Sequence, residues 1–364
     1  MKRNYKQWFL MLFTPPSLRV YLIAAEQHFP KVSVVMAVYN KAPYLRQSLD
    51  SVIKQNMANF ELICVDAAST DSSLQILEEY SAKDPRIKVY RTSYSRIPAV
   101  TKNYGIARSK GDYVFNLDAD DYLRFDTLKK MYIKAKETGA DAVIPDLQTV
   151  SETGQNLPVY LSGIKGNRGI MLSNRQAVTE SLDWGIHGFA LWRGDLLRRI
   201  RLEEFGAYSD EYSTRVLFFD CRTVAFSEGV YFHRFSGKSL TGKLSLQLCD
   251  RPYATYRVAS FLEKYSFNQR NIDSQHFAAF KDCCYLLNAR SRLAPKDTAE
   301  AERRIRLVYN QIDMQRVRKS VCTLKPGRAA MWPPHGKVKK FLFALLTLPG
   351  WGFLKRVPLK YLFS

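Results

Sequence analysis

The sequence has 364 residues, of which 46% are hydrophobic and 24% are charged, and its formal net charge is +21. This composition argues against wholesale disorder, and the length predicts one large domain with appendages or two domains. Residues 1–31 and 301–364 together contribute 16 of the 21 net positive charges. Basic ends predict contact with a polyanion, either an anionic membrane leaflet or a nucleic acid, unless they are solvated tails.

The cysteines and the apolar runs bear on the compartment. The six cysteines form no C-x-x-C pair and no zinc-like spacing, which favours a reducing cytoplasm. The apolar runs near the two ends, Trp8–Phe13 and Phe341–Leu348, are far shorter than the roughly 20 residues that span a bilayer. We therefore expect neither a transmembrane helix nor a cleaved signal peptide.

Short apolar, β-branched segments alternate with helical patterns in the first part of the chain. The strands are expected at 32–39, 60–65, 87–90, 113–117 and 142–144, and the helices at 44–55, after Ser69, at 99–107 and at 123–138. This alternation predicts right-handed βαβ units and a largely parallel sheet, with ligands bound beyond the carboxyl ends of the strands. Residues 251–313 form a helical pattern, and residues 314–364 a basic, aromatic tail.

The segment VFNLDADDYL, residues 114–123, crowds three carboxylates at the end of an apolar strand: Asp118, Asp120 and Asp121. Carboxylates this close repel one another unless a cation lies among them. Oxygen ligands on a loop suit Mg²⁺ or Mn²⁺ shared with substrate phosphates. The alternative is an N-cap for the helix expected at 123–138, and such capping can be the whole role of Asp121. Three acids exceed what capping needs, so we predict a metal–phosphate site.

Polar residues also follow the first two strands. Asp66 has no helix to cap directly and is predicted to accept a hydrogen bond from a base or ribose, whereas Ser69 or Asp71 is expected to cap the next helix. Tyr39 can stack on a planar base or can be an ordinary surface tyrosine. These positions meet at one sheet edge if the strands are parallel.

An acidic pair, Asp210-Glu211, lies far along the chain. Paired acids can raise the pKa of one member and make it a general base. The alternative is an exposed helix N-terminus, where acids are common.

Together these stretches resemble glycosyltransferase family 2, the inverting enzymes with the GT-A fold. The resemblance rests on VSVVMAVYNK at 32–41, FELICVD at 60–66, and the segment from KNYG to DADD at 102–121. It is close over 32–125 and looser to about 240. It implies an α/β, Rossmann-like, mostly parallel sheet flanked by helices, with a C-terminal helical extension. The expected organisation is a basic and apolar extension (1–31), a GT-A domain (32–240), a helical region (241–313) and a basic amphipathic tail (314–364).

The resemblance also implies roles for individual residues. It implies that Tyr39 and Asp66 hold the base of the nucleotide and that Asp118 contacts its ribose or diphosphate. Lys102 and Asn103 lie where the family often has Arg-Asn, near the diphosphate. These five residues are the expected nucleotide-sugar site.

For the reaction itself, the resemblance implies a divalent cation, Mn²⁺ or Mg²⁺, bound by Asp120. His233 is a candidate second ligand or a structural histidine. The catalytic base is expected in Asp210-Glu211, which reverses the family's usual Glu-Asp order, and either acid can be the base. The chain departs from the family at Ala67-Ala68, where Asp-Gly is usual, which removes one possible nucleotide contact.

The implied activity is sugar transfer from a nucleotide-diphosphate donor to a hydroxyl of a glycan or lipid-linked acceptor in bacterial surface-polysaccharide synthesis. The tail mixes lysines with Trp, Phe and Leu, which suits an anionic membrane interface, so we expect a cytoplasmic protein peripheral on the inner face of the membrane. The tail can alternatively pack as a helix on the main domain. One rival function is a nucleotidyltransferase, which would need a loop rich in Gly, Arg and Lys after the first strand; residues 39–42 are not such a loop. The other is a nucleic-acid binder, but the sequence contains no recognised nucleic-acid-binding module.

Overall fold

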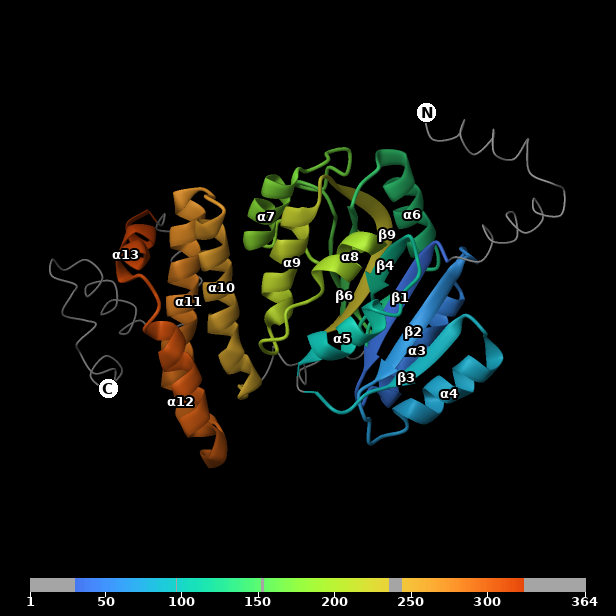
Figure 1. Cartoon of the computed structure of the whole chain (residues 1–364), viewed down its shortest axis with the longest axis horizontal. Helices are drawn as coiled ribbons and strands as arrows, with labels where there is room; N and C mark the ends of the chain where they lie inside the picture. The colour runs from blue at the N-terminus through green and yellow to red at the C-terminus, as the bar shows by residue number, and fades with distance from the viewer. Residues whose placement is uncertain (1–29, 96, 152–153, 236–243, 324–364) are drawn as a thin grey trace.

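The computed structural model describes residues 30–95, 97–151, 154–235 and 244–323 (Figure 1). The N-terminal extension up to residue 29, the tail from residue 324, and the boundary that we expected near residue 240 lie outside the described residues.

A single mixed sheet forms the centre of the molecule, in the order β3-β2-β1-β4-β8-β6-β9-β5, with β7 paired to β6. Its first half is parallel, as predicted: β1 (Val32–Val38), β2 (Phe60–Asp66), β3 (Ile87–Arg91) and β4 (Tyr113–Asn116). β1 and β2 are almost entirely buried because helices cover both faces, which explains their continuous apolar sequences.

The second half of the sheet is mixed, which differs from the mostly parallel arrangement that we expected. β8 runs antiparallel to β4 and β6, whereas β9 runs parallel to β6. The strands of this half are β5 (Tyr122–Leu123), β6 (Ala142–Ser151), β7 (Asn156–Tyr160), β8 (Leu191–Arg193) and β9 (Val224–Phe235). β5 pairs with Tyr231 and Phe232 of β9, so the helix expected at 123–138 begins only at Thr127.

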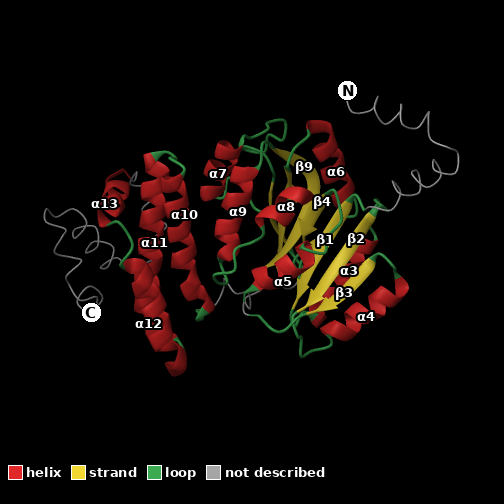
Figure 2. Cartoon of the chain, in the orientation of Figure 1, coloured by secondary structure: helices red, strands yellow, loops and turns green. Residues whose placement is uncertain are grey.

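Helices cover both faces of this sheet (Figure 2). One apolar core packs β1 against α3 (Ala42–Ile53), α4 (Ser73–Lys83) and α6 (Thr127–Thr138). The other packs the opposite side of the sheet against α5 (Pro98–Ile106), α7 (Asn174–Leu182), α8 (Gly194–Ile200) and α9 (Ser209–Asp220). The result is the three-layer α/β architecture that the alternating pattern predicted.

A helical unit follows, comprising η1 (Gln247–Asp250), α10 (Arg251–Lys264), α11 (Gln269–Ala289), η2 (Arg290–Arg292), α12 (Pro295–Tyr309) and α13 (Met314–Thr323). α10 joins the two parts because Val258 and Phe261 enter the core beside α9, while Ala254 packs among the later helices. Met314 and Val317, at the start of the segment expected as the tail, lie in α13 and belong to this helical core. None of the helices in the described ranges is long and apolar enough to cross a bilayer.

Candidate active site

The loop after β1 is fixed to the loop after β2. Asn40 adopts the left-handed conformation with φ 50°, and its Oδ1 accepts hydrogen bonds from the backbone N–H groups of Thr70 (2.8 Å) and Asp71 (3.3 Å). Asp71 in turn accepts from the first backbone N–H of α4, at Ser73 (2.9 Å), and of α3, at Ala42 (3.1 Å). Asp71 is the N-cap residue of neither helix, since Ser72 and Lys41 hold those positions, but its carboxylate accepts from the first N–H of both. These bonds hold the polar ends of β1 and β2 together.

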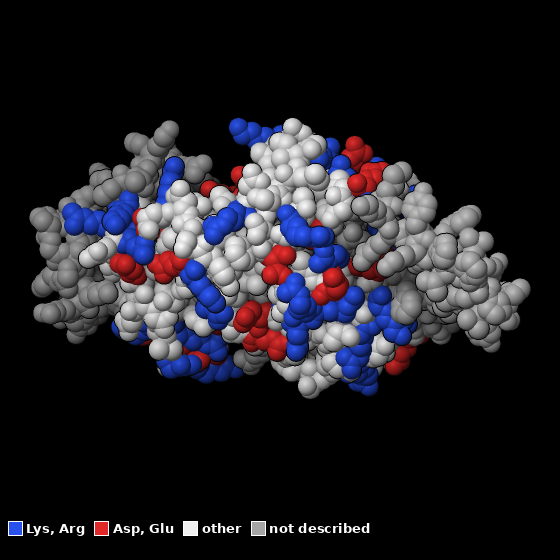
Figure 3. Space-filling view, turned by 45° about the horizontal axis from the view of Figure 1, so that its top comes forward, with Lys and Arg blue, Asp and Glu red and all other residues white. Residues whose placement is uncertain are grey.

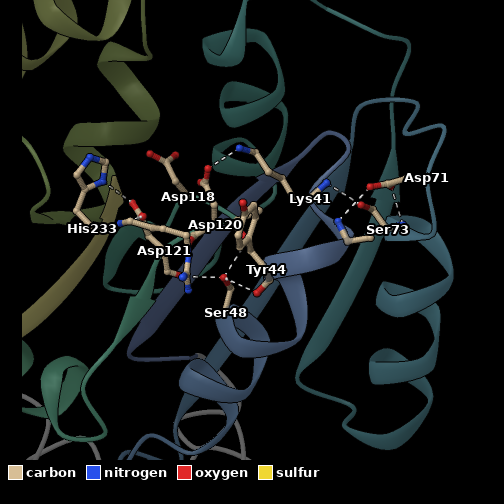
Figure 4. Close-up of polar contacts among 12 residues, drawn as sticks. Lys41, Tyr44, Ser48, Asp71, Ser73, Asp118, Asp120, Asp121 and His233 are labelled. Atoms are coloured by element: carbon tan, nitrogen blue, oxygen red, sulfur yellow. Dashed lines mark hydrogen bonds and ion pairs between the residues drawn. The ribbon is translucent and has the colours of Figure 1, made fainter. Parts of the chain in front are cut away.

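The acids after β4 are neutralised by lysines from two other segments. Lys102 of α5 pairs with Asp118 at 2.8 Å, and Lys41 pairs with Asp120 (Figure 4). Burial alone would raise the pKa of Asp118, but the Lys102 ammonium outweighs it and holds that pKa below the ordinary value. Burial likewise opposes the charge of Lys102, yet Asp118 keeps its pKa above the usual range. In this structure the repulsion between the neighbouring carboxylates is therefore offset by two lysine side chains.

Asp121 plays a different part from the helix cap considered above, because α6 starts six residues later and Asp126 occupies its N-cap position. Asp121 is buried, and its carboxylate accepts from the Tyr231 hydroxyl (2.6 Å) and the Arg234 backbone N–H (2.7 Å). Its Oδ2 also lies 3.1 Å from Nδ1 of His233. Asp121 therefore fastens the acidic loop to β9.

His233 approaches the acidic loop from the side opposite Lys41 (Figure 4). The hydrogen bond to Asp121 raises the pKa of His233 above its ordinary value despite partial burial. A histidine that ligates a metal commonly gives its other ring nitrogen to a carboxylate, and the Nδ1 contact to Asp121 leaves Nε2 for such a ligand. The contact also suits a purely structural histidine.

The residues present can supply only some of the ligands that a divalent cation needs. Within the described ranges no group of three or more His, Cys, Asp and Glu side chains is placed to hold a metal ion. Asp120 is 24% exposed and already faces a cation, and His233 can add one nitrogen. Mg²⁺ is usually held by one or two carboxylates together with substrate phosphates, so the donor would supply the remaining ligands.

The predicted base-binding residues lie at the same edge of the sheet. Asp66 is fully buried; its Oδ2 accepts from the backbone of Ser69 at 3.2 Å, while its Oδ1 has no partner among the described residues. A buried, unpartnered carboxylate oxygen is costly, so it suits a hydrogen-bond donor on a ligand. Tyr39 is 39% exposed and contacts Tyr94, with ring centroids 4.7 Å apart. Tyr94 carries no pattern that would have singled it out in the sequence.

Asn103 lies elsewhere, although its neighbour Lys102 reaches the acidic loop. Its buried amide donates to the Leu202 carbonyl (2.7 Å) and to Glu204 (2.7 Å), and it accepts from the Leu202 backbone (2.8 Å). These bonds occupy the side chain and tie α5 to the loop before α9. We therefore leave Asn103 out of the donor site proposed below.

Asp210 and Glu211 occupy the first turn of α9 but differ in surroundings. Glu211 forms an ion pair with Arg215, a nearly buried side chain that also donates to the Ser181 carbonyl at 2.7 Å. Asp210 is solvent-accessible, yet desolvation by the protein around its carboxyl group, with the charge of Glu211, raises its pKa to about 6. The charges of Lys102 and Asp118 also act on this pKa, the first lowering it and the second raising it. A raised pKa and an open face are what a general base needs.

Residues 33–201 match the family described as Glycosyl transferase family 2. This part of the chain is a glycosyltransferase family 2 domain. The domain is 39% identical over 103 residues to an uncharacterized glycosyltransferase of Haemophilus influenzae, covering 28% of this chain and 41% of that protein. It is 37% identical over 127 residues to a poly(ribitol-phosphate) beta-glucosyltransferase of Bacillus spizizenii, covering 34% of this chain and 20% of that protein. The chain thus spans less than half the length of these two relatives.

The GT-A fold is confirmed by a wider structural match. The crystal structure of S. aureus TarS in complex with UDP-GlcNAc superposes with a TM-score of 0.60 at 18% identity, covering 86% of this chain and 87% of that chain. The match extends through the helical unit, so the sheet domain and the C-terminal helices share an architecture with a glycosyltransferase.

Proposed function

We propose that this glycosyltransferase is an inverting enzyme that moves a sugar from a nucleotide-diphosphate donor to a hydroxyl of a glycan or lipid-linked acceptor in surface-polysaccharide synthesis. The observation that carries the proposal is the edge of the sheet where Lys102 and Lys41 pair with Asp118 and Asp120, together with Asp210, an exposed carboxyl group whose pKa desolvation and the charge of Glu211 raise to about 6. The fold shared with TarS, crystallised with UDP-GlcNAc, and the relative that acts on poly(ribitol-phosphate) support this donor and acceptor class.

The proposed reaction uses the charged groups described above. Asp210 takes the proton of the acceptor hydroxyl, whose oxygen attacks the anomeric carbon on the face opposite the diphosphate. The bond from that carbon to the diphosphate oxygen breaks, and the anomeric configuration inverts. The leaving diphosphate gains negative charge beside Lys102 and Lys41, which lie at this edge. A cation held by Asp120 and His233 would add Lewis-acid stabilisation of the same charge.

The face of the molecule seen in Figure 3 gives no support to a nucleic-acid function. On the face shown in Figure 3, Lys and Arg side chains are spread among Asp and Glu side chains rather than gathered into one stripe. Binding along a phosphate backbone relies on a clustered basic surface. We therefore propose no nucleic-acid partner.

Thermal-shift screening of UDP-, GDP- and dTDP-sugars, with and without Mn²⁺, tests the donor class. One nucleotide sugar is expected to raise the melting temperature, and more strongly with Mn²⁺, because a ligand that binds only the folded state stabilises it. A screen in which no nucleotide sugar shifts the melting temperature would count against the proposed function.

Asp66→Asn is expected to weaken binding of the selected nucleotide about tenfold, since hydrogen bonds to charged groups contribute roughly 1.5–3 kcal/mol. Titration calorimetry measures the affinity. Asp112→Asn is the matched control, because Asp112 is exposed at the amino end of β4, away from the proposed site. Equal affinities for wild type and Asp66→Asn would remove Asp66 from the donor site.

We also propose peripheral attachment through the basic tail. The full chain is expected to float with anionic liposomes, whereas a chain ending at residue 323 is expected to stay in the unbound fraction. The cut keeps α13, whose side chains complete the helical core. Flotation of the shortened chain at the level of the full chain would place membrane contact outside the tail.

A further inference from the structure

Lys41 has a fixed backbone and a movable charge. Lys41 is the N-cap residue of α3. Its backbone N–H donates to Ser73 Oγ at 2.9 Å, and its carbonyl accepts from the Leu45 N–H at 2.9 Å. Its side chain is 35% exposed and reaches across to Asp120 Oδ2. A lysine stem is flexible, so the ammonium group can change partner while the loop stays in place.

This ion pair uses the carboxylate that the proposed function assigns to a divalent cation. Two cations at one carboxylate oxygen repel each other, and the repulsion is stronger near a protein surface than in bulk water because the effective dielectric constant is lower there. The neighbouring acid Asp118 has a separate partner, Lys102, so Lys41 is not needed there. Lys41 thus makes the free protein a poorer cation site than its acids alone would be.

We propose that Lys41 is an internal counter-ion of Asp120 that competes with the divalent cation and moves to the donor's diphosphate when the cation binds. The inference rests on the proposed function, because it uses that function's cation and donor. A nucleoside diphosphate offers Lys41 a new anion and so frees Asp120. By linkage, the cation and the nucleotide then strengthen each other's binding to the same extent. Lys41 contacts the donor in this scheme, and its exchange of Asp120 for the diphosphate couples the binding of the cation to the binding of the nucleotide.

The test measures Mn²⁺ affinity by electron paramagnetic resonance of free Mn²⁺, first without nucleotide and then with saturating UDP or GDP. Lys41→Met is expected to bind Mn²⁺ about tenfold more tightly than wild type without nucleotide, which corresponds to about 1.4 kcal/mol. The gain in affinity on adding the nucleoside diphosphate is expected to be smaller in Lys41→Met than in wild type.

Two further variants separate charge from folding. Lys41→Arg keeps the positive charge and is expected to retain the weak Mn²⁺ binding of wild type. Lys54→Met removes a lysine from the other end of α3, where it pairs with Asp50, and is also expected to match wild type. Thermal unfolding checks that each variant is folded.

The outcomes distinguish the two claims. Unchanged or weaker Mn²⁺ binding in folded Lys41→Met overturns the counter-ion role, even where UDP or GDP binds and the donor site stands. If the wild type and every variant bind neither Mn²⁺ nor UDP or GDP, the proposed function is overturned together with this inference. Tenfold tighter binding that Lys41→Arg shares equally would also overturn it, because charge would then not be the cause.

Discussion

Asp210→Asn is expected to lower kcat by about a thousandfold while donor affinity stays within about twofold of wild type. A positioned general base contributes roughly 10²–10⁴-fold, and an amide cannot accept the proton of the acceptor hydroxyl. Release of the nucleoside diphosphate under saturating donor and acceptor measures kcat, and calorimetry with the donor measures binding. Asparagine preserves the size of the side chain, so a lost rate with preserved binding isolates the proton transfer.

Glu211→Gln is the matched control on the same helical turn. It makes the same change in charge, but Glu211 is committed to Arg215, so only a few-fold loss in kcat is expected. Removing its partner leaves the nearly buried Arg215 uncompensated, so the loss should fall on stability instead. If Glu211→Gln lost the rate and Asp210→Asn kept it, the two acids would exchange roles.

The pH profile gives this assignment a second reading. A base must be deprotonated to act, so kcat/KM is expected to fall as the pH drops through about 6, the pKa of Asp210. The charge of Glu211 raises that pKa, so in Glu211→Gln the acid limb should move to lower pH. An acid limb that stays in place in Glu211→Gln would assign the titration to another group.

The contribution of each sequence pattern is clear at the strand ends. Short apolar runs predicted β1, β2 and β4, and the residues at or just beyond their carboxyl ends, Tyr39, Asp66 and Asp118, lie at one edge because those strands are parallel. That inference needs only local pattern and one rule about parallel sheets. It required no knowledge of which side chains touch.

The partners of these residues could not be predicted, because they come from distant segments. Asp121 looked like a helix cap until β9, more than a hundred positions away, supplied Tyr231 and Arg234. Asn103 looked like a phosphate ligand until the loop at Leu202 occupied its amide. Polar side chains with several possible partners have no periodicity, so their final contacts depend on the assembled fold.

The direction of the strands in the second half of the sheet could not be predicted, for a related reason. β8 has only three residues, and neither its composition nor its length distinguishes an antiparallel strand from a parallel one. Direction there follows from how the connections cross the sheet. The helix expected at 123–138 began late because tertiary pairing of β5 with β9 overrode a local helical pattern.

Asp120→Ala is expected to abolish transfer, lowering kcat/KM by about a thousandfold or more. Asp120 is the carboxylate at which a cation faces the proposed diphosphate position, whether that cation is Lys41 or a divalent ion. Charge stabilisation of a leaving group by one fixed element typically accounts for about 10²–10³ in rate, and a metal ion adds several kcal/mol. A kcat/KM within about twofold of wild type would show that Asp120 has no part in the reaction.

The double variant Asp120→Ala with Lys41→Met separates two causes of that loss. In Asp120→Ala the ammonium group of Lys41 loses its carboxylate and is free to bind the diphosphate too early or in the wrong place. If this misplaced charge caused the defect, removing it would restore much of the rate. If Asp120 acts by holding the divalent cation, the double variant stays as inactive as the single one, because neither change returns a ligand to the cation. We expect the second result, with Mn²⁺ binding lost in both variants.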